Sequence, residues 1–321
     1  MRWGLLSTAH INGKLLAGAQ GTDEATVVAV ASRDRSRAEA FAREQGIERA
    51  HASYEALLED PDVDAIYNPL PNSMHVPWSV RALEAGKHVL CEKPMTRRVA
   101  EAEEAFAAAE RAGRVLEEAF MWRHHPQTQR LRELLDEGVI GQLRLVQASF
   151  SHPLTDVGDI RMQRVLDGGS LMDVGCYCLS GARLVAGAEP ERVAAEQVLG
   201  GDGVDVVFAA TLTFPGEVIG QFHSGFAVGG RHHLEAIGDE GSLYLSDPWH
   251  GQAPGIELRR EGETERIEIS PANPYTHELV DFGRAVRGEA PPLLGKADAL
   301  AQARAIEALY AAAESGTPVA L

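Results

Sequence analysis

The chain has 321 residues, a formal net charge of −17 at pH 7 and a hydrophobic content of 45%. Chains longer than about 250 residues usually divide their apolar side chains between two cores, so the length predicts two domains. The negative charge argues against binding to nucleic-acid phosphates or anionic membranes, which need clustered Lys and Arg side chains. No apolar stretch is long enough to cross a membrane, and the first residues run directly into a strand-like segment, so we expect no signal peptide.

The three cysteines are Cys91, Cys176 and Cys178, and they include no C-x-x-C pair. Cys176 and Cys178 are too close in sequence for an unstrained disulfide. We therefore expect free thiols in a reducing compartment, which predicts a cytoplasmic protein.

The first 120 residues alternate strand and helix patterns, which is typical of a parallel sheet covered by helices on both faces. Five of the six expected strands, the first, second, fourth, fifth and sixth, have patterns over residues 3–6, 27–31, 64–67, 88–93 and 115–120. Helix patterns cover residues 36–45, 54–58, 76–85 and 99–112. Gly46, Gly86 and Gly113 follow three of these helices as C-terminal caps. We predict a doubly wound, Rossmann-type parallel sheet of six strands in a domain over residues 1–121.

Strand patterns dominate the second half of the chain. A helix is expected over residues 127–137 and a strand over 143–150, followed by strands over 192–199, 204–214, 217–228, 232–237 and 242–246. Gly and Pro separate the later strands, and two helices, over 276–287 and 296–313, end the chain. We predict a second α/β domain over residues 122–321, with a mostly antiparallel sheet.

The segment after the first strand lies where dinucleotide-binding folds carry the fingerprint G-x-G-x-x-G. All three glycines are replaced, but Ser7 and Ala9 are small enough for the backbone to approach a pyrophosphate at a helix N-terminus. We predict a dinucleotide site lined by Ser7, Thr8, Ala9, His10 and Ile11. The alternative is an ordinary strand–turn–helix connection.

The second strand ends in Ser32-Arg33-Asp34. A site that prefers NAD usually has Asp or Glu at this place to bind the ribose 2′-hydroxyl, whereas Ser32 and Arg33 suit a 2′-phosphate. We therefore predict NADP(H) in preference to NAD(H), although the Asp34 carboxylate could still accept a ribose hydroxyl. The alternative is a helix entry with a solvated arginine.

The fourth strand runs into Asn68-Pro69-Leu70-Pro71-Asn72-Ser73-Met74-His75, a loop stiffened by two prolines. At the carboxyl edge of the sheet this loop could form a wall of the nicotinamide site, and we assign Pro69, Leu70, Asn72 and His75 to it. A structural role, with Asn72 or Ser73 capping the next helix, is compatible with this assignment.

Cys91-Glu92-Lys93-Pro94 ends the fifth strand pattern and delivers a lysine to the same edge. Pro94 then prevents the strand from continuing. The Lys93 ammonium can act as a point charge or, with a lowered pKa, as a proton donor.

In the second half, Gly168 and Gly169 precede a helix pattern in which Asp173 and Tyr177 stand four residues apart on one face. A phenol near a lysine is a suitable proton donor for carbonyl reduction, because the ammonium lowers the pKa of the phenol. Asp173 could orient the substrate or the lysine. The alternative is a capping box of Ser170 and Asp173, with Tyr177 as a core aromatic residue.

Arg123 and His124 follow the sixth strand pattern and could line a pocket for a polar substrate, or belong to a domain linker. The adjacent pairs His124-His125 and His232-His233 point apart and lack the spacing of metal ligands. We therefore predict no metal.

Five segments of the chain together resemble the Gfo/Idh/MocA oxidoreductases, and they occur in the order of that family. They are residues 3–9, Ala31-Ser32-Arg33-Asp34, residues 68–75, Cys91-Glu92-Lys93-Pro94 and Asp173-Val174-Gly175-Cys176-Tyr177. The serine at the first turn, the arginine after the second strand and Tyr177 are most similar to the NADP-dependent branch with D-xylose 1-dehydrogenases and dihydrodiol dehydrogenases. Tyr177 stands where inositol-type members have His, which argues against a cyclitol substrate.

The resemblance implies an N-terminal Rossmann domain and a C-terminal domain whose open sheet binds a small-molecule substrate on one face. The other face of that sheet would form a homodimer or homotetramer. Lys93 and Tyr177 would be the proton-transfer pair with Asp173 as their orienting partner, and Lys93, Arg123, His124, Asp173 and Tyr177 would contact substrate. Glu92 and Lys93 would be the remaining residues of the cofactor-binding site, and Glu92 would fix the backbone of Lys93.

The sequence thus predicts an NADP(H)-dependent oxidoreductase that transfers hydride to or from a sugar-like or cyclic-diol substrate. Two other functions occur on the same fold: a nucleotide-sensing regulator and a glycosidase that uses bound NAD. Lys93, Asp173 and Tyr177 together disfavour the regulator, which needs no proton-transfer pair. Arg33 disfavours the NAD-dependent glycosidase.

Overall fold

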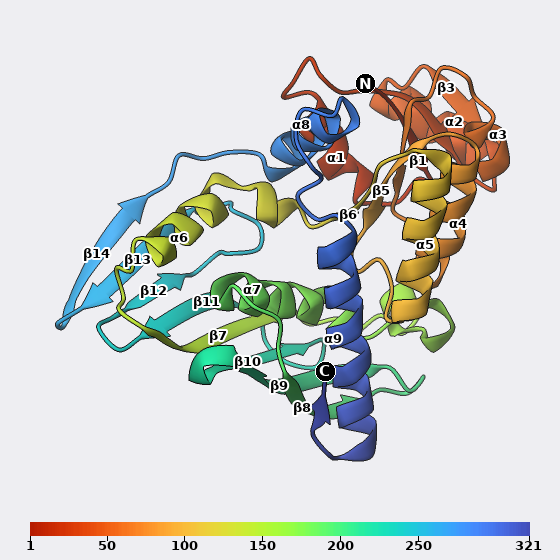
Figure 1. Ribbon diagram of the computed structural model, residues 1–321. Coiled ribbons are helices and arrows are strands. Elements are labelled where there is room, and N and C mark those ends of the chain that lie inside the picture. Colours follow the sequence, from red (N-terminus) through yellow and green to blue (C-terminus); the bar gives the residue numbers. More distant parts are fainter. The chain divides into compact units, whose positions relative to one another are not determined.

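A computed structural model describes residues 1–321, which divide into two compact units (Figure 1). Unit 1 contains residues 1–121 and 273–300, and unit 2 contains residues 122–272 and 301–321. Each unit has its own sheet. No helix in the structure is both long enough and apolar enough to span a membrane.

The sheet of unit 1 has six strands, all parallel. They are β1 (Arg2–Leu6), β2 (Thr26–Ala31), β3 (Arg49–His51), β4 (Ala65–Asn68), β5 (His88–Glu92) and β6 (Leu116–Ala119). Their order, β3-β2-β1-β4-β5-β6, is that of a Rossmann fold and confirms the predicted doubly wound sheet. The order reverses between β1 and β4, and such a reversal is where open α/β sheets bind their ligands.

Six helices belong to unit 1 (Figure 1). They are α1 (Asn12–Ala19), α2 (Arg35–Gln45), α3 (Tyr54–Leu58), α4 (Asn72–Glu84), α5 (Val99–Ala112) and α8 (Pro274–Val286). α2 and α5 end at Gly46 and Gly113 in the left-handed conformation, as predicted. α4 begins four residues before the expected start at Val76, because Pro71 takes the N-cap position and Pro77 is accommodated inside the helix.

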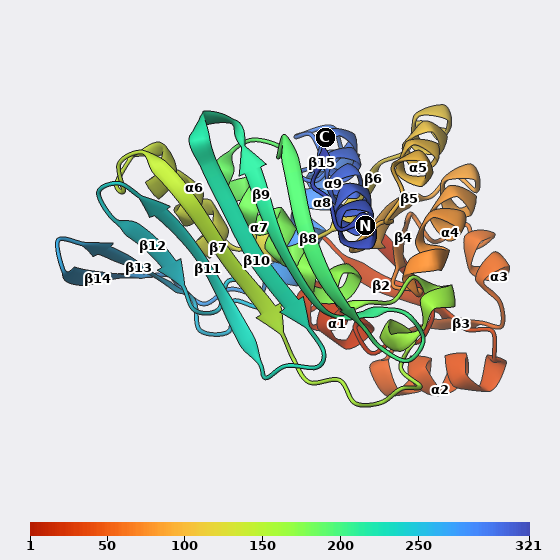
Figure 2. The same ribbon diagram turned by 90° about the horizontal axis from the view of Figure 1, so that it is seen from below.

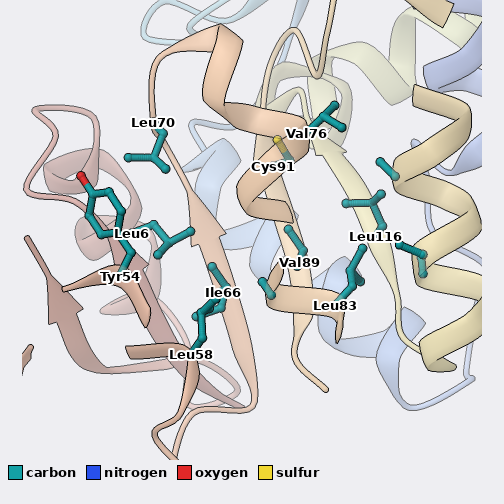
Figure 3. Close-up of a cluster of buried hydrophobic side chains, with 14 of the residues drawn as sticks. Leu6, Tyr54, Leu58, Ile66, Leu70, Val76, Leu83, Val89, Cys91 and Leu116 are labelled. Atoms are coloured by element: carbon teal, nitrogen blue, oxygen red, sulfur yellow. The ribbon is translucent and has the colours of Figure 1, made fainter. Parts of the chain in front are cut away.

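Two apolar cores cover the two faces of this sheet, because successive side chains of a strand point to opposite faces. One core contains Leu6 and Ile66, with Leu83 and Leu116 packed beside them (Figure 3). The other contains Leu5 and Tyr67 of the same strands. Burial on both faces explains why these strands are continuous apolar runs in the sequence.

α8 follows the strands of unit 2 in the chain but packs on α1 in unit 1. Gly18 makes the close approach possible, because a Cβ atom there would lie 2.5 Å from Cβ of Tyr275. Thr276 donates a hydrogen bond from Oγ1 to the carbonyl oxygen of Gly18 at 2.8 Å. The rings of Trp3 and Phe282 are 5.1 Å apart and extend this contact into the core.

The sheet of unit 2 has nine strands in the order β14-β13-β12-β11-β7-β10-β9-β8-β15 (Figure 2). Their bounds are β7 (Leu143–Ser151), β8 (Arg192–Leu199), β9 (Asp205–Phe214), β10 (Val218–Gly225), β11 (Arg231–Gly238), β12 (Ser242–Leu245), β13 (Gly255–Arg260), β14 (Glu263–Glu268) and β15 (Val319–Ala320). All pairs are antiparallel except β7 with β10, which confirms the predicted sheet type. β14 had no predictable apolar pattern, because it is an exposed edge strand of charged residues.

The helices of unit 2 are α6 (Pro126–Asp136), α7 (Cys176–Ala186) and the part of α9 (Lys296–Ser315) from residue 301 onward. α7 packs against β7 and β10, and a π-helical turn (Leu171–Gly175) leads into it. Figure 2 shows the opposite face of the sheet in front of these helices, with none of them over it. Cys91, Cys176 and Cys178 are buried and free, as predicted.

Candidate active site

Ser7 takes over the backbone role of the first fingerprint glycine. Its φ of +94° lies in the region that glycine favours, and it directly follows β1 at the reversal of strand order. Its Oγ accepts a hydrogen bond from the Ala9 amide at 3.2 Å, and its carbonyl accepts one from the Asn12 side chain at 2.8 Å. The turn therefore has the shape that the glycine fingerprint provides, although none of its glycines is present.

Asn12 occupies the place of the third fingerprint glycine and is fully buried at the start of α1. Its Oδ1 atom is buried and has no hydrogen-bond partner. Buried polar atoms are usually paired, so this amide is suited to a ligand or an ordered water at the turn. These features fit a dinucleotide bound between the ends of β1 and β4.

Asp34 has a structural role at the end of β2. Its carboxylate is the N-cap of α2, where it accepts a hydrogen bond from the Ser36 hydroxyl at 2.7 Å and one from the Arg37 amide at 3.2 Å. The Ser36 hydrogen bond is the main reason that the pKa of Asp34 is lowered. Both hydrogen bonds go to Oδ1, which fixes the carboxylate at the start of α2, and Ser32 and Arg33 are the other side chains at this strand end suited to a ribose substituent.

The exposed Arg33 side chain lies by the hydroxyl of Tyr54. Burial raises the pKa of this phenol, and the charges of Arg33 and Arg37 oppose the rise without cancelling it. Tyr54 in turn packs edge-on against Trp78 at 4.9 Å. Arg37 and Tyr54 were not among the predicted site residues. Arg33 precedes the N-cap Asp34 and Arg37 lies in the first turn of α2, so no helical spacing links the two and no motif marks Arg37.

The loop from Asn68 to His75 is fixed from inside the protein. Asn68 is buried and donates to the His75 carbonyl at 2.9 Å and to Ser79 at 3.1 Å. The ring of His75 is 1% exposed, with Nδ1 2.8 Å from the carbonyl oxygen of Pro94 and Nε2 2.7 Å from that of Leu70. His75 thus ties the loop after β4 to the segment after β5, which brings the predicted Pro-rich wall beside Lys93.

Glu92 connects two neighbouring strands and the lysine. Its carboxylate accepts hydrogen bonds from the Tyr67 hydroxyl at 2.5 Å and from the Lys93 amide at 3.2 Å. The pKa of Tyr67 is raised well above its usual value, first by burial and then by the Glu92 charge, so the phenol stays a donor. Glu92 therefore fixes the backbone that carries Lys93.

In unit 2 a buried carboxylate holds the π-helical turn that carries Asp173. Oδ2 of Asp205 accepts hydrogen bonds from the Ser170 hydroxyl and the Leu171 amide, both at 2.7 Å, and Oδ1 accepts one from Tyr310 at 2.9 Å. Burial raises the pKa of Asp205, and these hydrogen bonds oppose that effect. π-helical turns often occur at functional sites.

Gly169 allows this close packing. Its φ is +123°, and a Cβ atom there would lie 2.2 Å from Oδ1 of Asp205. The capping box considered for Ser170 and Asp173 is wrong, because Ser170 makes no capping hydrogen bond and donates to Asp205 instead.

Asp173 lies between an imidazole and a guanidinium group. Its Oδ2 is 3.4 Å from Nε2 of His152 and 3.6 Å from a guanidinium nitrogen of Arg161. The hydrogen bond to Asp173 is the main reason that the pKa of His152 is raised. Neither partner was predicted, because both lie between β7 and the π-helical turn, where no sequence motif marks them.

Tyr177 is 8% exposed and lies among aromatic side chains. Its ring is 5.3 Å from that of Phe150 on β7 and 6.0 Å from that of Trp249. Arg123 donates to the Ser180 hydroxyl at 3.2 Å on α7, one helical turn beyond Tyr177, whereas His124 is fully buried. Of the residues predicted for unit 2, Asp173, Tyr177 and Arg123 therefore gather around the start of α7.

Residues 4–120 match the family described as an oxidoreductase family with an NAD-binding Rossmann fold, and residues 128–244 match the GFO/IDH/MocA C-terminal domain. The chain is also 37% identical to the D-xylose 1-dehydrogenase (NADP(+)) 2 of Haloferax volcanii, with 100% of both chains covered. The chain belongs to the Gfo/Idh/MocA oxidoreductase family. The predicted family and the predicted class of enzyme are confirmed.

Two further members extend the comparison. The trans-1,2-dihydrobenzene-1,2-diol dehydrogenase of Bos taurus is 36% identical over 85% of this chain and 81% of its own. The crystal structure of KijD10, a 3-ketoreductase from Actinomadura kijaniata in complex with NADP and TDP-benzene, has a TM-score of 0.92 and 35% identity, with 97% of both chains covered. The fold of this family is therefore present over nearly the whole chain.

We expect Asp205→Ala to lower the free energy of unfolding by about 3 kcal/mol, because three buried donors lose one charged acceptor. Urea unfolding followed by circular dichroism measures the change. Asp202→Ala is the control: that carboxylate is exposed and accepts one amide, from Arg164, so its loss should cost less than about 1 kcal/mol. Equal losses in the two variants would contradict the role given to Asp205.

We expect the His152–Asp173 pair to stabilise the protein at low rather than high pH. The folded-state pKa of His152 is raised, so the stabilisation is complete below the unfolded value of about 6.5 and is lost as pH rises through the folded-state pKa. NMR titration of the imidazole should show its pKa falling in Asp173→Asn. His223, whose pKa is lowered by burial, should titrate unchanged, and an unaltered His152 would contradict the pairing.

Proposed function

We propose that the protein is an NADP(H)-dependent oxidoreductase that transfers hydride between the nicotinamide and a hydroxyl-bearing or carbonyl carbon of a sugar-like or cyclic-diol substrate. The relatives confirm the predicted reaction and cofactor, because they include an NADP-dependent sugar dehydrogenase, a diol dehydrogenase and a 3-ketoreductase with NADP bound. The observation from this chain that supports NADP(H) is the arrangement of side chains at the end of β2. There Asp34 is engaged in capping α2, and Ser32 and Arg33 remain for a 2′-phosphate.

The reaction in the oxidation direction removes a hydride from the carbinol carbon and a proton from its hydroxyl, which leaves a carbonyl. The nicotinamide supplies hydride transfer when bound. Ser7, Ala9 and Asn12 form the turn for the pyrophosphate, and the loop that His75 fixes forms the wall beside the nicotinamide. The protein therefore has to supply orientation and a route for the proton.

We assign the proton transfer to the pair of Tyr177 and Lys93. Tyr177 would accept the proton from the substrate hydroxyl in oxidation and return it in reduction, and Lys93 would supply the positive charge that favours the phenolate. Asp173, held by His152 and Arg161, orients the reacting oxygen. In this proposal unit 1 binds the cofactor and supplies Lys93, and unit 2 binds the substrate.

We expect Tyr177→Phe and Lys93→Ala each to lower kcat by a factor of about 10² to 10⁴, because each removes a group from the proton transfer. The assay is NADP⁺ reduction, with NAD⁺ in parallel, across a panel of aldoses, cyclitols and a cyclic trans-diol. NADP⁺ affinity, measured by calorimetry, should stay within a few fold. Tyr244→Phe and Lys296→Ala, which alter a sheet tyrosine and an exposed lysine, should keep full activity.

The outcomes of this assay also separate the alternatives. Unchanged turnover in both Tyr177→Phe and Lys93→Ala would overturn the assigned roles. Tight NADP⁺ binding without turnover on any substrate class would support a nucleotide-sensing regulator. An NAD molecule retained through purification would support the glycosidase.

We expect Arg33→Ala to raise the KM for NADP⁺ by roughly 10- to 100-fold, because a charge-assisted contact to the 2′-phosphate is lost. The KM for NAD⁺, which has no such phosphate, should change less than about twofold. Arg35→Ala is the matched control, since Arg35 is exposed on the same helix end and its guanidinium is 3.9 Å from Glu39. A parallel loss of both cofactors would show that Arg33 acts on the fold and not on the phosphate.

The protein is further proposed to form a homodimer or homotetramer through the face of the unit 2 sheet that α7 leaves uncovered. This face has a hollow of about 670 Å³, lined by small side chains of β8 and β9 and by larger ones of β10, among them Gln221 and His223. Ile219 is 45% exposed on β10 of the same sheet. The predicted cytoplasmic location stays a prediction.

We expect Ala209→Arg, in the middle of this face, to dissociate the oligomer, because a charge would be buried without a partner. Light scattering coupled to size-exclusion chromatography measures the mass. Ala40→Arg on the exposed side of α2 makes the same chemical change and should leave the mass unaltered. A wild-type protein that is monomeric at micromolar concentration would contradict the assembly.

A further inference from the structure

Three metal-ligating side chains that no role above uses meet in unit 2. His232 comes from β11, and Asp247 and His250 come from the loop after β12. One ligand atom from each side chain lies within 4.8 Å of the other two. The imidazole rings of His232 and His250 are 5.4 Å apart, and Nδ1 of His250 is 3.8 Å from Oδ1 of Asp247.

The three side chains are held close to positions suited to coordination. Oδ2 of Asp247 accepts hydrogen bonds from the amides of Gln252 and Ala253, at 2.7 and 3.1 Å, which fixes the position of the carboxylate. Nδ1 of His232 is buried and has no hydrogen-bond partner, so part of the bonding capacity of the ring is unused.

The spacing is within reach of a coordination sphere. Ligand atoms around a tetrahedral zinc ion lie about 3.3 Å apart when each bond is about 2.0 Å long. The three atoms of the cluster must approach one another by about an ångström or more to reach this separation. His250 is exposed, and rotation of its side chain can supply much of this movement.

We propose that His232, Asp247 and His250 form a binding site for a divalent transition-metal ion of the zinc type. Two imidazoles and one carboxylate are a donor set that such ions accept, and three protein ligands leave a fourth position open to water or a substrate oxygen. The site borders the aromatic group of Tyr177, because Phe150 packs on His232 at 4.7 Å and on Tyr177 at 5.3 Å. The sequence predicted no metal, because the adjacent histidine pairs lack ligand spacing and His232 is well separated in the chain from Asp247 and His250.

The test is calorimetric titration of the untagged protein with Zn²⁺, and Co²⁺ titration followed by visible absorption, without substrate or cofactor. We expect one equivalent of metal to bind and the Co²⁺ spectrum to show nitrogen and oxygen ligands. His232→Gln and His250→Gln should each weaken binding at least about tenfold. Since turnover is not measured, failure of this site and failure of the proposed reaction are distinguishable.

His233→Gln is the matched control. His233 is the next residue on β11, points to the other face of the sheet and is 2.6 Å from the Ser149 hydroxyl, so its loss should leave the metal affinity unchanged. Asp247 also holds its own loop, so the exposed His250 is the ligand whose substitution separates metal binding from folding. No saturable binding, or equal affinity in wild type and His250→Gln, would overturn the proposal.

Discussion

The parallel pairing of β1 with β2 and β4 is the constraint on which the cofactor half of the structure depends. Parallel strands end at one edge, so this pairing collects the turn at Ser7, the side chains of Ser32 and Arg33, and the loop after Asn68. Reversal of the strand order between β1 and β4 separates the helices there and leaves room for a ligand. A Ser7 with φ of +94° shows that the conformation of this turn, and not the glycine itself, is what the fold requires.

Unit 2 depends on a different kind of interaction, a buried carboxylate that accepts hydrogen bonds from several donors. Asp205 on β9 reaches the start of the π-helical turn and Tyr310 on α9, so one side chain links the sheet to both helical elements. Gly169 can lie this close to the Asp205 carboxylate because it has no side chain. The local geometry of the turn that carries Asp173 therefore depends on a residue much later in the chain, because Asp205 is 35 residues from Ser170 and 34 from Leu171.

A polar side chain in the candidate site can have one of two roles. It can contact a ligand, or it can hold in place the residues that do. His75, Asp34 and Glu92 all stood among motif residues, yet the structure gives each of them internal partners. Such residues keep a loop, a helix end or a strand end in place. They make the site rigid without having to contact a ligand, which is why their residue types alone could not separate the two roles.

The sequence by itself determined most elements of the Rossmann sheet, because strands buried on both faces are continuous apolar runs and glycines end the helices. It did not locate β3, a three-residue edge strand without an apolar run. It also determined the positions of Lys93, Asp173 and Tyr177 in local motifs. Only the tertiary structure decided the contacts of distant segments: α8 on α1 through Gly18, His152 and Arg161 beside Asp173, and the loop after β12 beside His232. These contacts join residues far apart in the chain through packing and electrostatics. Neither packing nor electrostatic pairing between distant segments leaves a periodic pattern in a single sequence.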